Sequence, residues 1–428
     1  MKKRLFYLYF IVMTFSLNAE VILSGKAGAQ AGFFMDLSAF LDSPQKAEFY
    51  LYPALQAYGD RYEFYSQAAI QMNDLKNIPG IFIGEFNFSL FLGDYLKFNL
   101  GKFQYQPGMA NLNGPLSFFQ TVEYDRLLEG RTNSANFPTG LLQGTLFLGD
   151  FFIKATGQFI RNPFSFVKPK SVWFPRNQFP DSIQVSFPSP RILPLKEIII
   201  EETNIGFNIF DFSASLELGG TFSSMDVSLL YYYGYNNSPM FLVTPQFPNG
   251  LVDFNLDLKP VFPKNHALGV SLSYSADPLL FYSDMAIILD KAYKVTNNLE
   301  DELEYSRSAY FQIAAGMSFF WEKLNLLTII EYNSADFFNA APAQPLFLNQ
   351  LAFLSLSWLD PNDKIKISLN NIVELNNFSF VNALQFVWNL DFDIELKLYV
   401  PFFWGEPQDD LGQFNDNHYL AISAEWIF

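Results

Sequence analysis

The stretch Tyr419-Leu420-Ala421-Ile422-Ser423-Ala424-Glu425-Trp426-Ile427-Phe428 alternates apolar and polar positions with a period of two. Every even-numbered residue from Leu420 to Phe428 is apolar, whereas Ser423 and Glu425 lie between them. Successive side chains of a strand point to opposite faces, so this stretch predicts a strand with one apolar and one polar face. The alternative is an edge strand of a soluble sandwich.

The same alternation recurs upstream, in segments 85–90, 153–159, 213–218, 311–319 and 392–399. In the last of these, the charged residues Asp393, Glu395 and Lys397 alternate with apolar ones. A slip of one residue would move all three charges to the apolar face, so the register of this strand is strongly fixed.

Short turns separate these segments and determine the predicted strand count. Three turns are Gly-Asp pairs, at 59–60, 93–94 and 149–150, because glycine reaches positive φ without a steric penalty. Further turns are predicted within 219–225, 276–278, 321–323, 359–363 and 390–391. Eight hairpins with a first strand in 21–33 and a closing strand predict 18 strands, with 16 or 14 as alternatives. Both chain ends then lie on the side of the short turns.

The composition indicates where such strands belong. Half of the residues are hydrophobic, with 50 Phe and 22 Tyr, yet no charge-free apolar stretch after the N-terminus is long enough for a membrane-spanning helix. Many short amphipathic strands instead predict an all-β fold, a transmembrane antiparallel up-and-down β-barrel with long extracellular loops. The chain has no cysteine, and its net charge of −16 argues against nucleic acid as a partner.

The N-terminus predicts export. Met1-Lys2-Lys3-Arg4 precedes an apolar run that ends by Leu17, followed by Ala19. This run fits a signal peptide and is short of the ~20 residues of a membrane-spanning helix. We expect residues 1–19 to be cleaved and 20–428 to form a barrel in the cell outer membrane, among its lipids. The apolar face of the last strand, with Leu420, Ile422, Trp426 and Phe428, resembles the C-terminal signal read by the barrel-assembly machinery.

Long irregular stretches at 106–138, 161–203, 236–263, 291–308 and 402–417 predict the extracellular loops. The segment 161–203 is rich in proline, which cannot donate a strand hydrogen bond. Its aromatic residues favour a loop that packs over the mouth or folds into the lumen and narrows the pore. The alternative is an ordered surface cap with no role in transport. The basic residues expected to line this constriction are Arg161, Lys168, Lys170, Arg176 and Arg191.

The polar faces of the strands predict the residues that line the pore. The basic positions are Lys97, Lys154, Lys366 and Lys397, and the acidic ones are Glu217, Asp284, Glu331, Asp393, Glu395 and Glu425. Six acids against four bases predict a weak preference for cations. Equally, these residues could be solvated wall groups paired across strands, with selectivity set by the loops.

The sequence offers little for catalysis or for a cofactor. Its two histidines, His266 and His418, lie far apart, and the parity of a strand places Ser423 on the opposite face from His418. We therefore expect no enzyme activity, no metal site and no cofactor.

The order of several motifs resembles the large-porin families related to alginate-export channels. The motifs are 96–102, Asn113-Gly114-Pro115-Leu116, 228–235 followed by Pro239, and 412–415 before the closing strand. The resemblance implies a monomeric 18-stranded barrel through which small solutes diffuse passively. Gln106-Pro107-Gly108 stands where the relatives usually show a Trp-Gly pair, so the substrate class does not transfer. The alternatives are a transporter of hydrophobic molecules such as long-chain fatty acids, and a surface adhesin on an inert barrel.

Overall fold

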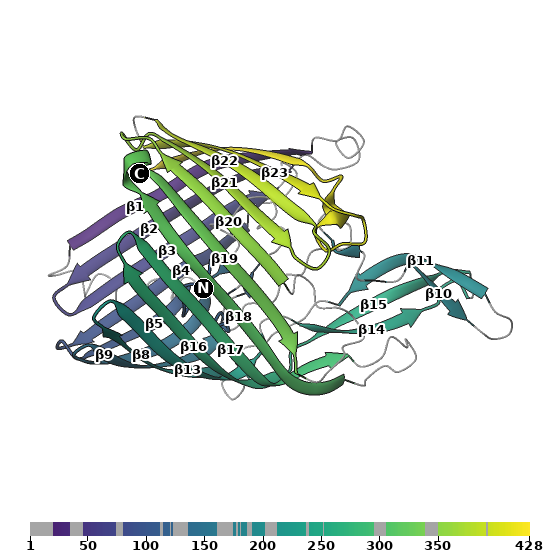
Figure 1. The fold of residues 1–428 in the computed structure, drawn as a ribbon, viewed down its shortest axis with the longest axis horizontal. Coiled ribbons are helices and arrows are strands. Elements are labelled where there is room, and N and C mark those ends of the chain that lie inside the picture. Colours follow the sequence, from purple (N-terminus) through teal and green to yellow (C-terminus); the bar gives the residue numbers. More distant parts are fainter. Residues whose placement is uncertain are drawn as a thin grey trace, which may run out of the picture.

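The computed structural model describes a closed antiparallel barrel of 18 strands (Figure 1). The described residues are 20–34, 46–73, 80–111, 114–119, 121–122, 136–160, 174–176, 179, 181–185, 191–201, 212–236, 239–250, 252–294, 305–338, 350–390 and 393–428. The barrel strands are β1 (Glu20–Phe34), β2 (Lys46–Gly59), β3 (Tyr62–Asn73), β4 (Gly80–Leu92), β5 (Leu96–Phe103), β8 (Thr139–Leu148), β9 (Phe151–Ile160), β12 (Ser213–Phe222), β13 (Met225–Tyr235), β16 (Lys264–Ala276), β17 (Leu279–Lys294), β18 (Tyr305–Trp321), β19 (Leu326–Phe337), β20 (Gln350–Leu359), β21 (Ile365–Glu374), β22 (Phe380–Leu390), β23 (Ile394–Trp404) and β24 (Tyr419–Ile427).

The first and last strands close the barrel. β1 pairs antiparallel with β24 in a register that runs from Lys26 opposite Ile427 to Phe34 opposite Tyr419. Next to the Lys26–Ile427 pair, the Gly25 amide donates to the Phe428 carbonyl at 2.7 Å, and the Phe428 amide donates to the Gly25 carbonyl at 2.9 Å. The sheet therefore has no free edge, as a structure in lipid requires.

All eight predicted turns connect consecutive barrel strands, so the predicted count of 18 is confirmed. Gly93 and Gly149 adopt the positive φ angles expected of them, 64° and 65°. Gly59 does not, because it is still part of β2 and the turn follows it. Glu20 pairs with Tyr58, next to the first turn, and Phe428 also lies at this end of the barrel.

The outside of the barrel is apolar and its inside is polar. On β12, Leu216 and Leu218 are 44% and 45% exposed, whereas Glu217 between them is 5% exposed. β24 repeats the pattern, with Trp426 exposed and Glu425 buried. An apolar exterior that continues around a whole barrel is suited to lipid, since large exposed apolar patches are rare on soluble monomers. Among the described residues, no helix combines the length and the apolar character needed to cross a membrane.

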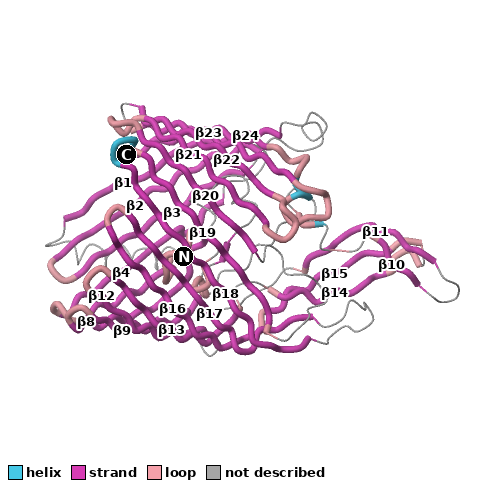
Figure 2. Tube along the Cα trace, in the orientation of Figure 1, coloured by secondary structure: helices cyan, strands magenta, loops and turns pink. Residues whose placement is uncertain are grey.

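A second, four-stranded sheet extends beyond the loop end of the barrel (Figure 2). It consists of β10 (Ser182–Val185), β11 (Arg191–Ile200), β15 (Phe254–Val261) and β14 (Met240–Gln246), in that order. We call it the outer sheet. β11 and β15 run parallel, whereas the other two pairs are antiparallel. Its apolar core, including Phe254 and Leu256, is continuous with buried residues at the loop ends of β22–β24.

The outer sheet corrects two loop predictions. Segments 161–203 and 236–263 were expected to be irregular, but each contributes two strands to this sheet. The short strands β6 (Thr121–Val122) and β7 (Asn136–Phe137) form a separate pair, and two 3₁₀ turns, η3 (Glu322–Leu324) and η4 (Gly412–Phe414), complete the described elements.

Candidate functional site

A segment after β5 folds into the barrel and binds its inner wall. It comprises residues 104–119, of which 104–111 and 114–119 are described, and we call it the lumen loop. No residue of 104–119 is charged. Three carboxylates on inward-facing positions of β12, β17 and β19 hold this segment.

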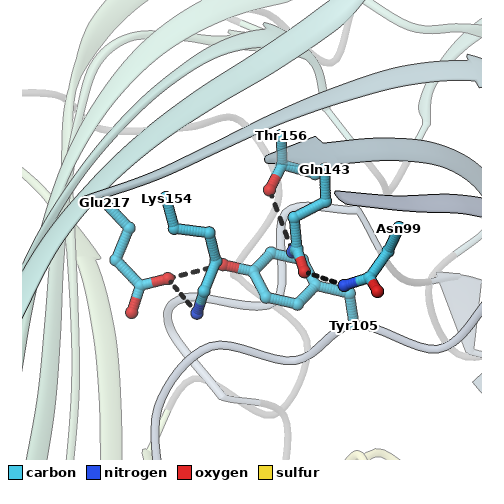
Figure 3. Close-up of polar contacts among 6 residues, drawn as sticks. All are labelled: Asn99, Tyr105, Gln143, Lys154, Thr156 and Glu217. Atoms are coloured by element: carbon cyan, nitrogen blue, oxygen red, sulfur yellow. Dashed lines mark hydrogen bonds and ion pairs between the residues drawn. The ribbon is translucent and has the colours of Figure 1, made fainter. Parts of the chain in front are cut away.

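Glu217 on β12 forms the first attachment (Figure 3). The Tyr105 hydroxyl donates to Glu217 Oε2 at 2.6 Å, and Lys154 Nζ on β9 donates to the same oxygen at 2.9 Å. Lys154 Nζ also lies 5.3 Å from the centre of the Tyr105 ring. Burial and the nearby carboxylate raise the pKa of Tyr105 above its ordinary value, so the hydroxyl keeps the proton that it donates.

Asp284 on β17 forms the second attachment. Its Oδ2 accepts the backbone amides of Met109 and Ala110 at 2.7 and 2.8 Å, and its Oδ1 accepts the Ser271 hydroxyl at 2.6 Å. Gly108 approaches this carboxylate with a φ of +91°, and a Cβ there would lie 2.4 Å from Asp284 Oδ2. Glycine is therefore required at this position, both for its backbone conformation and for the close approach.

Glu331 on β19 forms the third attachment. Its Oε2 accepts the backbone amide and the side-chain amide of Asn111 at 2.8 and 3.0 Å, together with the Tyr282 hydroxyl at 2.7 Å. Its Oε1 accepts from Asn333 Nδ2 at 2.7 Å. Glu331 and Asp284 are each 1% exposed. Buried carboxylates are costly unless they are well bonded, and here the lumen loop supplies much of that bonding.

Apolar residues hold the second half of the lumen loop. Leu116, Phe118 and Phe119 are buried in a cluster with wall residues of β8, β13 and β16–β19. The Phe118 ring stacks on that of Tyr232 at 4.7 Å, and Phe119 meets the same ring edge-on at 5.2 Å. A Cβ at Gly269 on β16 would lie 2.3 Å from Leu116, so this glycine makes room for the leucine.

These attachments place the lumen loop across the barrel. The loop leaves the wall at β5 and is bonded to β19, which is eight strands further round through β8, β9, β12, β13, β16, β17 and β18. In an 18-stranded barrel that is nearly half of the circumference. The apolar cluster fills the side bounded by β8–β19, so β20–β24 and β1–β4 bound the other side.

Uncharged polar side chains continue the inner wall on β4–β9. The Ser89 hydroxyl donates to Asn99, Asn99 Nδ2 donates to Gln143 Oε1, and Gln143 Nε2 donates to Thr156, at 2.7, 3.0 and 3.2 Å. Figure 3 shows the last two of these bonds beside the Glu217 attachment. All four side chains are buried, and buried polar groups need hydrogen-bond partners. Each of these side chains finds one in its neighbour.

Two lysines and two glutamates lie on the inner face where the barrel closes. Lys26 on β1 and Lys397 on β23 bind opposite oxygens of Glu425, at 3.0 and 2.8 Å, and Lys397 also binds Glu395 at 2.7 Å. We call these four residues the seam network. It links the strands on both sides of β24 and carries no net charge.

The predicted pore-lining residues therefore fall into distinct groups. Glu217, Asp284 and Glu331 hold the lumen loop, with Lys154 bound to the first of them. Glu395, Lys397 and Glu425 belong to the seam network. Lys97 lies near a turn, 4.8 Å from the Phe91 ring, and Lys366 is exposed near the turn that precedes β21. Asp393 was wrongly assigned to a strand: it lies in the turn before β23 with a φ of 57°.

In its described part, segment 161–203 packs at the mouth of the barrel through Phe174, Leu193 and Ile198, but the two described basic residues predicted for a constriction do not line the lumen. Arg176 and Arg191 are both exposed. Arg191 is the first residue of β11 in the outer sheet, and Arg176 Nε lies 3.8 Å from Asp181 Oδ1. This segment pairs with β15 of 240–261, and the apolar core that they share contacts inward-facing residues at the loop ends of β22–β24, including Val381, Phe403 and Tyr419. Arg161, Lys168 and Lys170 lie outside the described residues, as do residues 1–19.

Sequence reasoning missed the lumen loop. The stretch 106–138 was recognised as long and irregular, but nothing in it marked an inward course. The sequence did contain one indication of the inward course. The loop is uncharged, and distant strands carry acidic residues on their inward faces, where buried carboxylates require hydrogen-bond donors.

The two histidines lie apart from the lumen loop. His266 Nδ1 lies 2.7 Å from the outward-facing Tyr231 hydroxyl, and His418 Nδ1 lies 3.4 Å from the Phe403 amide. Within the described part of the chain, no three His, Cys, Asp or Glu side chains form a group that could hold a metal ion.

No family model and no curated protein matches the chain. Solved structures with a similar arrangement include a loop L8 deletion mutant of OmpT, an outer membrane protein of Vibrio cholerae, at 10% identity and a TM-score of 0.43, covering 96% of this chain and 99% of that chain. Salmonella typhi OmpF in complex with Daunomycin is 9% identical with a TM-score of 0.42, covering 95% and 97%. A mutant of the Rh. blastica porin is 8% identical with a TM-score of 0.41, covering 96% and 100%.

At these identities and TM-scores, the likeness assigns no function to this chain. The barrel assignment depends on the closed strand order alone. The resemblance to alginate-export channels stays a prediction.

Proposed function

We propose that this chain is an outer-membrane porin through which small solutes diffuse, narrowed by its lumen loop. The observation that carries the proposal is the course of that loop. It crosses from β5 to β19 and is attached by three carboxylates, so it reduces the cross-section without being part of the wall.

Export and membrane insertion belong to the same proposal. Residues 1–19 direct the chain across the inner membrane and are removed, and the apolar exterior then contacts outer-membrane lipids. We propose a monomer as the working unit, since one chain closes a complete barrel and holds a complete lumen loop, so the passage needs no second copy.

Planar-bilayer recording of the purified full-length barrel tests the channel proposal. Stepwise conductance increments are expected on insertion. A barrel that inserts, as shown by its altered mobility when unheated, but gives no increments would refute the proposal.

A further inference from the structure

Most acids of the inner wall are bonded to lysines or to uncharged donors, and this has a consequence for what can pass. The sequence alone suggested an excess of acids and a preference for cations. The structure assigns those acids differently: Glu217 is bound to Lys154, and Asp284 and Glu331 are covered by the lumen loop.

On the other side of the passage, the seam network supplies two positive and two negative groups that bind one another. Glu85 on β4, another inward-facing acid, lies within electrostatic reach of Lys102. The lumen loop itself is uncharged and exposes Gln104, Gln106 and Asn111. Between loop and wall, a solute therefore meets acids that are paired or covered, beside uncharged polar groups of the loop.

The wall facing the lumen loop also offers aromatic and hydrogen-bonding side chains. Tyr50 and Tyr52 on β2 point inward, with ring centres 5.1 Å apart and a tilt of 32° between the ring planes. Gly28 on β1 makes room for the first ring, because a Cβ there would lie 2.6 Å from the Tyr50 hydroxyl. Hydroxyl and amide groups continue around this wall, including a bonded pair, Ser355 and Asn370.

We propose that the passage favours neutral polyhydroxylated solutes, such as saccharides, over ions of similar size. The inference rests on the proposed porin function and specifies its substrate class. Rings of charge set ion preference in a pore, and here most of the described acids of the inner wall are either paired with lysines or bonded to uncharged donors of the loop and wall. Aromatic faces contact the apolar C–H faces of a sugar, while the amides and hydroxyls exchange hydrogen bonds with its hydroxyl groups.

The first test compares glucose, gluconate and glucosamine, which share a carbon skeleton and differ in charge. Liposomes containing the full-length protein should swell at least as fast in glucose as in either charged solute. The reversal potential in a KCl gradient should lie near zero. Swelling that is several-fold faster with either charged solute, or a permeability ratio between the ions above about ten, would overturn the inference.

Two variants of the seam network test the charge argument in opposite directions. Glu425→Gln leaves one glutamate with two lysines, so the reversal potential should shift toward anion selectivity. Lys26→Met leaves one lysine with two glutamates and should shift it toward cation selectivity. Shifts of the same sign, or none in either variant, would contradict the placement of these charges along the passage.

The tyrosine pair is tested by the block of ion current. A linear neutral glucose oligomer should reduce the current reversibly, and Tyr52→Ala should weaken this block several-fold relative to Tyr231→Ala, which changes an outward-facing tyrosine. Equal block in both variants would overturn the role of the pair. Failure of the channel proposal is distinct, because an inserted barrel would then give no conductance at all.

Discussion

At the scale of single residues, Gly108 is the point where the lumen loop depends most on backbone geometry. Any side chain there meets the Asp284 carboxylate and must also adopt a φ of +91°. We therefore expect Gly108→Ala to loosen the loop, giving a larger and noisier single-channel conductance. Gly157→Ala is the matched control, because a Cβ at Gly157 would have no neighbour within 4 Å. Identical recordings from both variants would show that the loop does not depend on this contact.

Asp284 gives a second prediction at this scale. Asp284→Ala removes the acceptor of the Met109 and Ala110 amides, and a buried amide left without a partner costs roughly 1–3 kcal/mol. Lower thermal stability and a higher conductance are expected together. Asp226→Ala is the control, because Asp226 bonds only to Thr221 and Ser273 among its described hydrogen bonds, away from the lumen loop. If Asp284→Ala lowered the thermal stability but left the conductance unchanged, the Asp284 carboxylate would not determine the pore size.

At the scale of elements, the lumen loop and the outer sheet are expected to differ in their effect on conduction. Replacing residues 106–117 with a short Gly-Ser linker should raise the conductance several-fold, since the segment that crosses the lumen is removed. Deleting residues 181–200, which include β10 and β11, should raise it less, because the outer sheet packs only at the mouth of the barrel and otherwise extends beyond it. If the deletion of 181–200 raised the conductance more than the replacement of 106–117, the Pro-rich segment 161–203 would be the constriction instead.

The same elements show what the sequence could and could not predict. Strands and turns were predicted because period-two alternation and Gly-Asp pairs act over a few residues. The attachments of the lumen loop join residues far apart in sequence, 112 positions for Tyr105 and Glu217 and 220 for Asn111 and Glu331, and no local pattern marks them. The outer sheet was missed because proline was taken as a sign of loops, yet Pro194 lies within β11.

At the scale of the whole molecule, the closing seam depends on Phe428. This residue exchanges two backbone hydrogen bonds with Gly25, and a Cβ at Gly25 would lie 2.7 Å from the Phe428 ring. We propose that the apolar face of β24 is also what the barrel-assembly machinery binds. Removing Phe428, or Phe428→Asp, should lower the yield of inserted barrel without reducing export, measured by heat-modifiable mobility of outer-membrane fractions. Phe428→Tyr is the control, and normal membrane levels of the deletion would refute the proposal.

The lumen loop has a mechanical consequence for the barrel. Inter-strand hydrogen bonds resist stretching around the circumference, but a thin cylindrical wall bends easily toward an oval cross-section. A segment fixed at β5, β12, β17 and β19 acts as a tie across the hollow and holds opposite parts of the wall at a set separation. The segment that narrows the pore thereby also keeps it round, so widening the pore by removing this loop should make its diameter less uniform from one molecule to the next.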